Sequence, residues 1–427
     1  MNIIDIIEKV KRRERLSREA IRFFVNGVTK GIIPDYQTSA LLMAVCINGL
    51  DDDETTELTL AMAESGDMLD LSSVGRPVVD KHSTGGIGDK TTIILGPILA
   101  ALGVPVAKMS GRGLGITGGT IDKLESIPGF NTEVSNDEFI KLIKDVGFVA
   151  AAQTISLAPA DKILYALRDV TGTVDSIPLI ASSIMSKKLA LGTNCIVLDV
   201  KYGNGAFMKD YDNAKKLADI MCNIGRNAGR KMSAVLSDMN QPLGYAIGNR
   251  LEIEEAIDYL TDKKIEKGLE KVINELCIEM YKLSDKYAGE DEETLKQMIR
   301  GVIEDGSAFD VFKRFVEIRG GNLETFISPE REKHYEELLS SGRLFKKEIE
   351  LSKDIDQLSA ELVGRASLML GAGRNKKDDA IDPYAGILFL NKPDDLKNDE
   401  MLKLVLYSGD AGKIEEVLQT HLKMFIE

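Results

Sequence analysis

Apolar residues recur at helical spacing through residues 1 to about 66, as in the segments IRFFV and LLMAV. Between these segments, Pro34 and Asp35 are typical of the first positions of a new helix. The segment ESGDMLDLSS, which begins at Glu64, is polar and shows no period. The pattern therefore predicts a helical N-terminal region that ends in a linker.

The hydrophobic pattern changes at Val78, where short apolar runs begin to alternate with glycine-rich loops and helical segments. The run VVD precedes a glycine-rich loop, TTIILGPILAALG has the pattern of a helix that ends at Gly103, and VPVAKMS follows as the next strand. Further strands are expected at CIVLDVK from Cys195 and at MSAVLSDM from Met232, and a helix at IEEAIDYL from Ile253. This order predicts an α/β fold with a parallel sheet, in which ligands bind at the carboxyl ends of the strands.

The C-terminal part begins with a charged segment, SPEREKHYEELLSSG from Ser328, which we interpret as a connection. The segments LFKKEIELSKD and YAGILFLNK carry apolar runs typical of strands, and KIEEVLQTHLKMFIE has the period of a helix. We therefore expect a last unit of mixed strands and helix.

The composition narrows the class of protein. At 427 residues the chain exceeds one ordinary hydrophobic core, so two or three domains are expected. A net charge of −14 makes it a poor general binder of nucleic acid, which needs a basic face. No apolar stretch is long enough to span a membrane, and the charged N-terminus lacks the apolar core of a signal peptide. We therefore expect a cytoplasmic protein that binds neither nucleic acid nor membrane.

The four cysteines form no CxxC pair, so buried reduced thiols are expected rather than a zinc or redox motif.

The first glycine-rich loop, DKHSTGGIGDKTT from Asp80 to Thr92, has the residue types of an anion site. Glycines let the backbone point N–H groups at an oxyanion, and lysine and hydroxyl side chains add charge and donors. Thr92 would stand at the start of the following helix, where the helix dipole favours an anion. A P-loop needs glycine directly before lysine, whereas Asp89 separates Gly88 from Lys90, so the segment departs from the ATP-binding motif. A glycine-rich turn without a ligand remains the alternative.

The second glycine-rich loop, KMSGRGLGITGGT, begins at Lys108 at the end of the strand VPVAKMS. It contains the pattern G-x-G-x-x-G at Gly113–Gly118, which formally matches the dinucleotide-binding fingerprint. That fingerprint opens a long helix, whereas here a proline and a glycine soon follow the segment IDKLES. Glu138 stands at about the distance of the ribose-binding acid, which means little in an acidic chain. The loop N–H groups with Ser110 and Thr120 suit a single phosphate equally well.

Both loops closely resemble those of the thymidine and pyrimidine-nucleoside phosphorylases, and most closely those of the pyrimidine-nucleoside phosphorylases. The segments are VDKHSTGGIGDKTT and KMSGRGLGITGGTIDKLESIPGF, and the second follows the long, specific pattern SGRG-apolar-x-x-TGGT-x-D-x-LE. The resemblance continues through IPDYQTSALLMAV, LRDVTGTVDSIPLIASSIMSKKLA and GRASLMLGAGRNKKDDAIDPYAG, in the order that the family shows. It covers essentially the whole chain.

The resemblance implies a fold and an activity. The fold is a small helical domain, a larger α/β domain with a mostly parallel sheet, and a C-terminal α+β unit, in a homodimer with substrate in the cleft between the first two domains. The expected segments are helical at 1–66 and 161–193, α/β at 67–160 and 194–335, and C-terminal at 336–427. The activity is the reversible phosphorolysis of uridine, thymidine or deoxyuridine to the free base and a pentose 1-phosphate. Inorganic phosphate is the co-substrate, and no organic cofactor is expected.

The resemblance also implies, position by position, which residues form the site. The phosphate ligands would be Lys81, Ser83, Thr92, Lys108, Met109, Ser110 and Thr120. The pyrimidine ligands would be Arg168, Ser183 and Lys187, and the catalytic groups would be Arg168, Lys187 and His82. A potassium ion would have the ligands Gly88, Lys90, Leu243, Ala246 and Glu255. Of these, Glu255 alone would supply a carboxylate, and the others would act through main-chain oxygens because the lysine ammonium repels a cation.

Two positions in these motifs bear on substrate preference. Ile116 stands where family members usually have histidine, which leaves the preference among pyrimidine nucleosides open. Lys108 is the residue type of members that accept both uridine and thymidine, whereas thymidine-restricted relatives tend to carry methionine there.

Phosphorolysis suits these residue types. A phosphate must be held behind C1′ of the sugar, and the departing pyrimidine must have its negative charge neutralised. The planar fork of Arg168 fits a carbonyl edge, Lys187 adds a concentrated charge, and His82 could donate to a base carbonyl. Two alternatives remain open: a phosphoribosyltransferase of related architecture, which would want paired carboxylates for magnesium, and a non-catalytic module that binds nucleosides or anions. Asp80 and Asp89 do not form an obvious magnesium pair.

Overall fold

The computed structural model describes residues 1–113, 115–153, 156–351, 358–376, 379–396 and 400–420. The chain divides into two compact units. The first unit comprises Met1–Asp80, Gln153–Leu198 and Lys215–Ala234, and the second comprises Lys81–Ala152, Asp199–Ala214 and Val235–Glu427.

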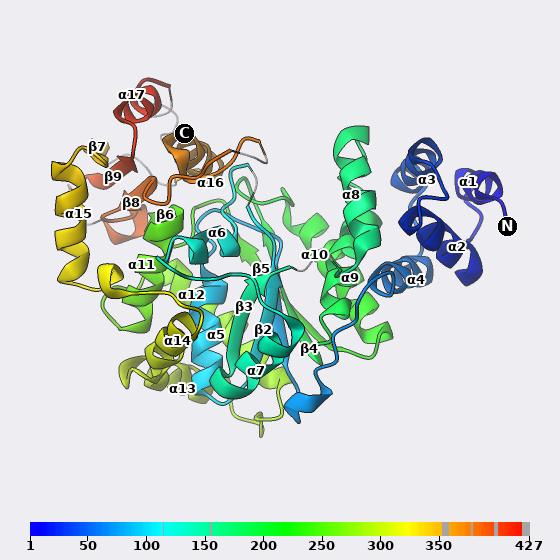
Figure 1. Cartoon of the computed structure of the whole chain (residues 1–427), viewed down its shortest axis with the longest axis horizontal. Helices are drawn as coiled ribbons and strands as arrows, with labels where there is room; N and C mark the ends of the chain where they lie inside the picture. The colour runs from blue at the N-terminus through cyan, green and yellow to red at the C-terminus, as the bar shows by residue number, and fades with distance from the viewer. Residues whose placement is uncertain (114, 154–155, 352–357, 377–378, 397–399, 421–427) are drawn as a thin grey trace. The chain divides into compact units, whose positions relative to one another are not determined.

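Helices dominate the first unit (Figure 1). They are α1 (Ile3–Lys11), α2 (Arg18–Thr29), α3 (Asp35–Asn48), α4 (Asp52–Ala63), α8 (Pro159–Thr171), α9 (Ile177–Ala190) and the part of α10 (Tyr211–Asn227) that begins at Lys215. Two of these helices begin at residues that commonly start helices. The Asp51 carboxylate accepts from the N–H of Glu54, and Glu54 accepts from the N–H of Asp51, so that α4 opens with a capping box. Pro34 stands at the N-cap of α3, as the sequence predicts.

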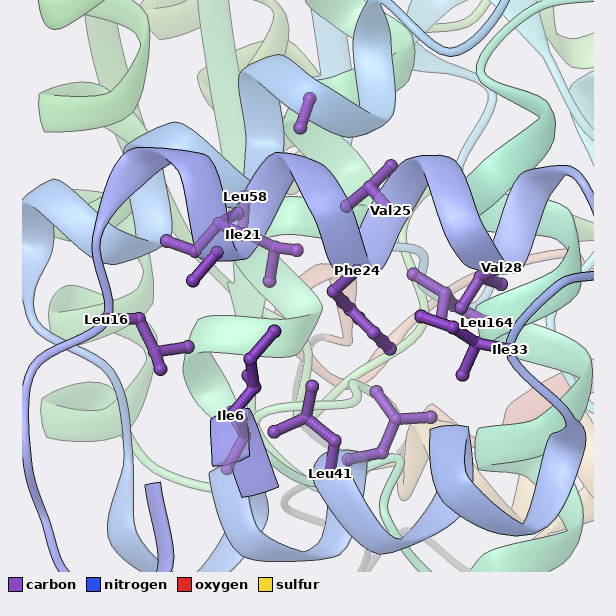
Figure 2. Close-up of a cluster of buried hydrophobic side chains, with 14 of the residues drawn as sticks. Ile6, Leu16, Ile21, Phe24, Val25, Val28, Ile33, Leu41, Leu58 and Leu164 are labelled. Atoms are coloured by element: carbon purple, nitrogen blue, oxygen red, sulfur yellow. The ribbon is translucent and has the colours of Figure 1, made fainter. Parts of the chain in front are cut away.

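One hydrophobic core holds this unit together. Figure 2 shows Phe24 of α2 among buried side chains that include Ile21, Leu41 and Leu58. Leu164 of α8 belongs to the same cluster, although more than a hundred residues separate it from α4. The period-3.6 stripes of the N-terminal helices are therefore covered in part by a segment that returns later in the chain.

A sheet of five strands in the order β3-β2-β1-β4-β5 forms the α/β part. The strands are β1 (Val79–Ser83), β2 (Val106–Ser110), β3 (Phe148–Ala152), β4 (Cys195–Tyr202) and β5 (Lys231–Asp238). β2 and β3 run parallel, with Ser110 opposite Ala152. The associated helices are α5 (Thr91–Ala101), α6 (Thr120–Glu125), α7 (Asn136–Val146), α10 (Tyr211–Asn227), α11 (Asn249–Leu260), α12 (Lys267–Leu283), α13 (Glu292–Glu304), α14 (Ser307–Ile318) and α15 (Glu330–Ser340).

A second, antiparallel sheet of four strands in the order β6-β8-β9-β7 occupies the C-terminal part. Its strands are β6 (Ala246–Ile247), β7 (Phe345–Leu351), β8 (Gly386–Phe389) and β9 (Leu402–Ser408). The helices beside it are α16 (Ala360–Ser367), a π-helical turn at Leu368–Ala372 and α17 (Ala411–Thr420). Single 3₁₀ turns lie at Ser72–Val74, Glu324–Phe326 and Pro393–Asp395.

These elements confirm the predicted fold class of a helical part, an α/β part and a C-terminal unit with strands and helix. The structure adds strands β3, β6 and β9, which the hydrophobic pattern did not identify, and it makes most of the charged segment from Ser328 a helix, α15. The end of the predicted C-terminal helix falls at 421–427, outside the described residues. The boundaries of the five expected domain segments stay a prediction. No helix in the described part of the chain is long and apolar enough to cross a membrane.

Helix α5 is buried on nearly all sides, because it is apolar around its whole circumference. Gly96 in this helix lies directly against the ring of Phe148, and a Cβ at this position would come within 2.2 Å of it. Gly96→Ala is therefore expected to lower the free energy of unfolding by about 1–3 kcal/mol, as overpacking does. Chemical denaturation of the full chain measures this change.

Gly301→Ala is the matched control for that substitution. Gly301 lies in helix α13, and nothing stands within 4 Å of a Cβ placed there. Alanine at this position is expected to leave the free energy of unfolding unchanged or to raise it by up to about 1 kcal/mol. Equal effects of the two substitutions would contradict the close packing of α5 on Phe148.

Candidate functional site

Lys81 on β1 is fully buried, and its side chain is held by acidic and hydroxyl partners. Its ammonium lies 2.7 Å from Asp199 Oδ2 and donates to Thr91 Oγ1 at 2.6 Å. Asp89 Oδ1 is 3.8 Å from the same nitrogen. Lys81 thus supplies a buried positive charge at the start of the first glycine-rich loop, and Asp199 and Asp89 balance this charge.

The Asp89 carboxylate connects two hydroxyl side chains of the first glycine-rich loop. The hydroxyls of Ser83 and Thr91 each donate to it at 2.5 Å. Burial by itself would raise the pKa of Asp89, but the charges of Lys81, Lys201 and Lys123 hold this pKa well below its usual range. The loop therefore carries an ionised carboxylate in the middle of several lysines.

Lys108 on β2 joins the second loop to the first. Its ammonium donates to the main-chain oxygen of Lys81 on the neighbouring strand at 2.7 Å. Ser110 is the last residue of β2, and Ser83 is the last residue of β1, so their hydroxyls lie at the carboxyl ends of adjacent strands. Because side chains alternate along a strand, His82 projects from the opposite side of β1 to Lys81 and Ser83.

The remaining expected phosphate ligands stand at helix starts or in the sheet. Thr92 is the second residue of α5 and is buried, and Thr120 is the first residue of α6 and is half-buried. Met109 is buried within β2 and can offer an anion only its main-chain groups. The structure therefore brings Lys81, Ser83, Lys108 and Ser110 onto two adjacent strand ends, with Thr92 and Thr120 at the helices that follow.

Sequence reasoning missed the charged groups that surround this site. Lys201 on β4 lies 2.9 Å from Asp199 and donates to Ser237 at 3.2 Å. Lys123 on α6 pairs with Glu252 at 2.7 Å and donates to the main-chain oxygen of Asp89 at 2.7 Å. Lys123 lies inside the quoted motif IDKLES, whereas Lys201 carries no signal beyond its place in a strand.

The Asp122 carboxylate holds the second glycine-rich loop in place, and the helix that follows this loop is short. Asp122 accepts from the N–H of Gly113 at 2.6 Å and from Arg374 at 2.8 Å. A Cβ on Gly113 would meet the nitrogen of Gly119 at 2.4 Å, so the loop closes on itself at that glycine. Helix α6 spans only six residues, which does not fit the long helix that a dinucleotide fingerprint opens.

Ile116, which follows in the same loop, lies close to the C-terminal part of the chain. A Cβ on Gly364 of α16 would come within 3.2 Å of the Ile116 Cβ. Leu114, two residues earlier in this loop, lies outside the described residues. Ile116 is thus part of the contact between the second glycine-rich loop and α16.

The expected pyrimidine ligands lie on helices α8 and α9 of the first unit. The Lys187 ammonium is paired with the Asp161 carboxylate and lies 3.2 Å from Ser183 Oγ, one turn earlier on α9. About a quarter of the Lys187 side chain remains exposed to solvent, with a side-chain exposure of 23%. Lys187 and Ser183 therefore form one group, and Asp161, which the sequence did not identify, orients it.

Arg168 is buried and holds the connection between α8 and α9. Its guanidinium donates to the main-chain oxygens of Thr173 at 3.1 Å, Leu179 at 3.0 Å and Val174 at 2.8 Å. Burial lowers the pKa of this guanidinium, and the negative charge of Asp161 opposes that shift. An arginine stays protonated in either case, so Arg168 keeps its charge beside the Lys187–Ser183 group.

Three of the five residues expected to hold potassium supply oxygens to the ammonium of a fourth, Lys90. The Lys90 Nζ donates to the main-chain oxygens of Leu243 and Ala246, each at 2.9 Å, and lies 2.5 Å from Glu255 Oε2. The main-chain oxygen of Gly88 accepts from the N–H of Lys90 at 2.9 Å. The main-chain ligand expected at Lys90 stays a prediction, and the side chain of this residue turns inward to the oxygens of Leu243, Ala246 and Glu255.

No cluster of three or more histidine, cysteine, aspartate or glutamate side chains that could hold a metal ion occurs among the described residues. Asp80 pairs with Lys188 at 3.0 Å, and Asp89 accepts from Ser83 and Thr91.

Family models match three consecutive parts of the chain. A glycosyl transferase family helical bundle domain matches residues 4–66, and the a/b domain of that family matches residues 75–309. A pyrimidine nucleoside phosphorylase C-terminal domain matches residues 355–425.

Curated relatives and a solved structure agree with these matches. The pyrimidine-nucleoside phosphorylase of Staphylococcus haemolyticus is 50% identical over 419 residues, which covers 98% of this chain and 94% of the relative. That of Geobacillus stearothermophilus is 48% identical over 426 residues, with 98% and 94% covered. An anthranilate phosphoribosyltransferase from Thermus thermophilus shares the fold, with a TM-score of 0.60, 18% identity and coverage of 73% of this chain and 98% of that chain. The chain belongs to the pyrimidine-nucleoside phosphorylase family of glycosyl transferases.

Proposed function

We propose that this protein catalyses the reversible phosphorolysis of pyrimidine nucleosides, with uridine, thymidine and deoxyuridine as candidate substrates. The observation that carries the proposal is that the chain holds two separate groups of cationic and hydroxyl side chains, one in each unit. One is a glycine-lined, lysine-backed loop pair at the ends of β1 and β2, and the other is the Lys187–Ser183 group with Arg168. Near-full-length identity of about half to pyrimidine-nucleoside phosphorylases supports it.

The loop pair is proposed to bind inorganic phosphate. Main-chain N–H groups of the two glycine-rich loops, together with the hydroxyls of Ser83, Thr92, Ser110 and Thr120, would donate to the phosphate oxygens. Lys81 would act mainly through its charge, because its ammonium is already hydrogen-bonded and ion-paired inside the loop. In this role the Lys81–Asp199 pair sets the shape and potential of the cradle, and Lys108 adds a second charge from β2.

The Lys187–Ser183 group and Arg168 are proposed to bind the pyrimidine. In the reaction a phosphate oxygen forms a bond to C1′ of the sugar while the bond from C1′ to the ring nitrogen breaks. The bonding electrons leave with the base, so negative charge grows on the ring and its carbonyl oxygens. A tethered ammonium and a guanidinium next to those oxygens stabilise that charge more strongly than they stabilise the neutral nucleoside, which is what accelerates the step. His82 would hydrogen-bond or protonate a carbonyl of the base.

An absorbance assay of base release tests the proposal. Uridine, thymidine and deoxyuridine are each incubated with the full chain in the presence and in the absence of inorganic phosphate, and the pentose 1-phosphate is measured alongside. Release of free base that requires phosphate and yields one pentose 1-phosphate per base is the expected result.

Two other outcomes of the same assay would overturn the proposal. Binding of uridine without turnover would identify a nucleoside-binding module. Activity that instead requires magnesium and phosphoribosyl pyrophosphate would identify a phosphoribosyltransferase, whose fold this chain shares. The homodimer implied by the family resemblance stays a prediction, which light scattering of the full chain would test.

A further inference from the structure

Lys90 lies in a cage of oxygen atoms that is fully enclosed by protein. Its side chain has no exposure to solvent, and its ammonium has three acceptors: Leu243 O and Ala246 O at 2.9 Å and Glu255 Oε2 at 2.5 Å. A lysine ammonium has three N–H donors and no acceptor. The three N–H donors match the three acceptors in number, so this one side chain can donate a hydrogen bond to every acceptor oxygen of the cage.

The cage is built for a single positive charge. The Glu255 carboxylate accepts from the N–H of Tyr245 at 2.6 Å and of Ala246 at 2.8 Å, which fixes both of its oxygens. Two carbonyl dipoles and one fixed carboxylate, all buried, would be costly to leave without a cation. Lys90 neutralises the carboxylate without drawing an ion from solution.

A metal ion has neither space nor favourable charge beside this ammonium. A Cβ on Gly244 would stand 2.6 Å from Lys90 Nζ and 2.6 Å from both Glu255 oxygens, so the backbone already closes tightly around the pair. A second buried ammonium lies nearby, since the charge of Lys90 is among the causes, after burial, that lower the pKa of Lys392. Another cation in the cage would meet like charges at short range with little solvent to screen them.

The cage connects the first glycine-rich loop to a distant segment. Lys90 is the N-cap residue of α5 and directly follows Asp89, which accepts from Ser83 and Thr91. Its partner Ala246 is in β6, the edge strand of the C-terminal sheet. Because its side chain is fully buried, Lys90 would act by fixing the loop and would be a positioning residue.

We propose that Lys90 is a built-in replacement for a bound monovalent metal ion, so that this chain folds and turns over without potassium. The part of the inference that concerns turnover rests on the proposed phosphorolysis. The part that concerns folding does not.

The test compares the wild type with Lys90→Thr and Lys90→Met in potassium, sodium and tetramethylammonium chloride at equal ionic strength. Thermal unfolding midpoints and kcat/KM for uridine are measured for each protein in each salt. Threonine shortens the side chain and leaves the oxygen cage open to an ion, whereas methionine removes the charge and keeps most of the volume.

The wild type is expected to show the same midpoint and the same kcat/KM in all three salts. In tetramethylammonium, Lys90→Thr is expected to lose stability and about 10- to 100-fold in kcat/KM, as losses of positioning groups do. Potassium should restore both with a saturable concentration dependence. Lys90→Met is expected to be destabilised in every salt, because the methionine keeps the ion out.

A saturable rise of the wild-type thermal unfolding midpoint or kcat/KM with potassium concentration would overturn the inference. This measurement needs only the wild type, so it tests the inference even if a variant does not fold. Equal stability of Lys90→Thr and wild type in tetramethylammonium would overturn it as well. If no salt supports turnover of any form while the midpoints behave as expected, the proposed phosphorolysis fails and the inference on folding stands.

Discussion

Replacing Lys187 with alanine is expected to lower kcat/KM for uridine phosphorolysis by about 100- to 1,000-fold, the usual cost of removing one preorganised donor from developing charge. Lys187 is the half-buried member of the proposed pyrimidine site, in which Arg168 and Ser183 are buried, and Asp161 and Ser183 hold its ammonium in place. Alanine leaves the departing base without that charge. Steady-state kinetics with uridine and phosphate measure the effect.

Lys162→Ala provides the matched control for this substitution. Lys162 is exposed and lies on the same helix as Asp161. Its replacement by alanine removes the same formal charge from the same unit as Lys187→Ala does. We expect its kcat/KM to stay at the wild-type value. If Lys187→Ala also kept near-normal kinetics while folded, Lys187 would have no place in the mechanism.

Lys81→Met is expected to lower the free energy of unfolding by about 3–5 kcal/mol, because Lys201 alone would then remain beside Asp199, and the charges of the buried Asp199 and Asp89 would no longer be balanced. The ammonium of Lys81 lies 2.7 Å from Asp199 with both side chains fully buried. Burial by itself would raise the pKa of Asp199, and the charges of Lys201 and Lys81 bring it below its usual value. Chemical denaturation near pH 7 measures the loss.

The same pair predicts how this loss depends on pH. A carboxylate with a depressed folded-state pKa stabilises the fold above its unfolded pKa and loses that contribution as the pH falls through the folded pKa. The difference between wild type and Lys81→Met should therefore be full at neutral pH and shrink toward acid pH. Lys81→Met combined with Asp199→Asn should recover part of the stability. Equal unfolding of wild type and Lys81→Met at pH 7 would contradict the buried pair.

The sequence was sufficient for most elements with a clear period. The apolar positions of α2 and α3 and the start of α3 at Pro34 and Asp35 depend on neighbours within a few positions, which a linear pattern records. Strand β3 (Phe148–Ala152) was missed because a short run of alanines and a valine has neither alternation nor length. Its assignment comes from pairing with β2, which is a tertiary contact.

The positions of the candidate site residues followed from two glycine-rich motifs and their resemblance to a family, but their partners did not. Asp161 lies 26 residues before Lys187, and Asp199 lies far along the chain from Lys81. Arg168 proved to be a structural residue as well, since it binds three main-chain oxygens of its own helix connection.

By itself, the sequence determined the fold class, the two glycine-rich loops and the residue types available for phosphorolysis, because each depends on local order along the chain. Only the tertiary structure decided which charges neutralise one another. The direction of the Lys90 side chain is the clearest case, since the same residue at the same position could point to solvent or into the cage of Leu243, Ala246 and Glu255. Electrostatic energy depends on distances between groups far apart in sequence, and those distances exist only once the chain is folded.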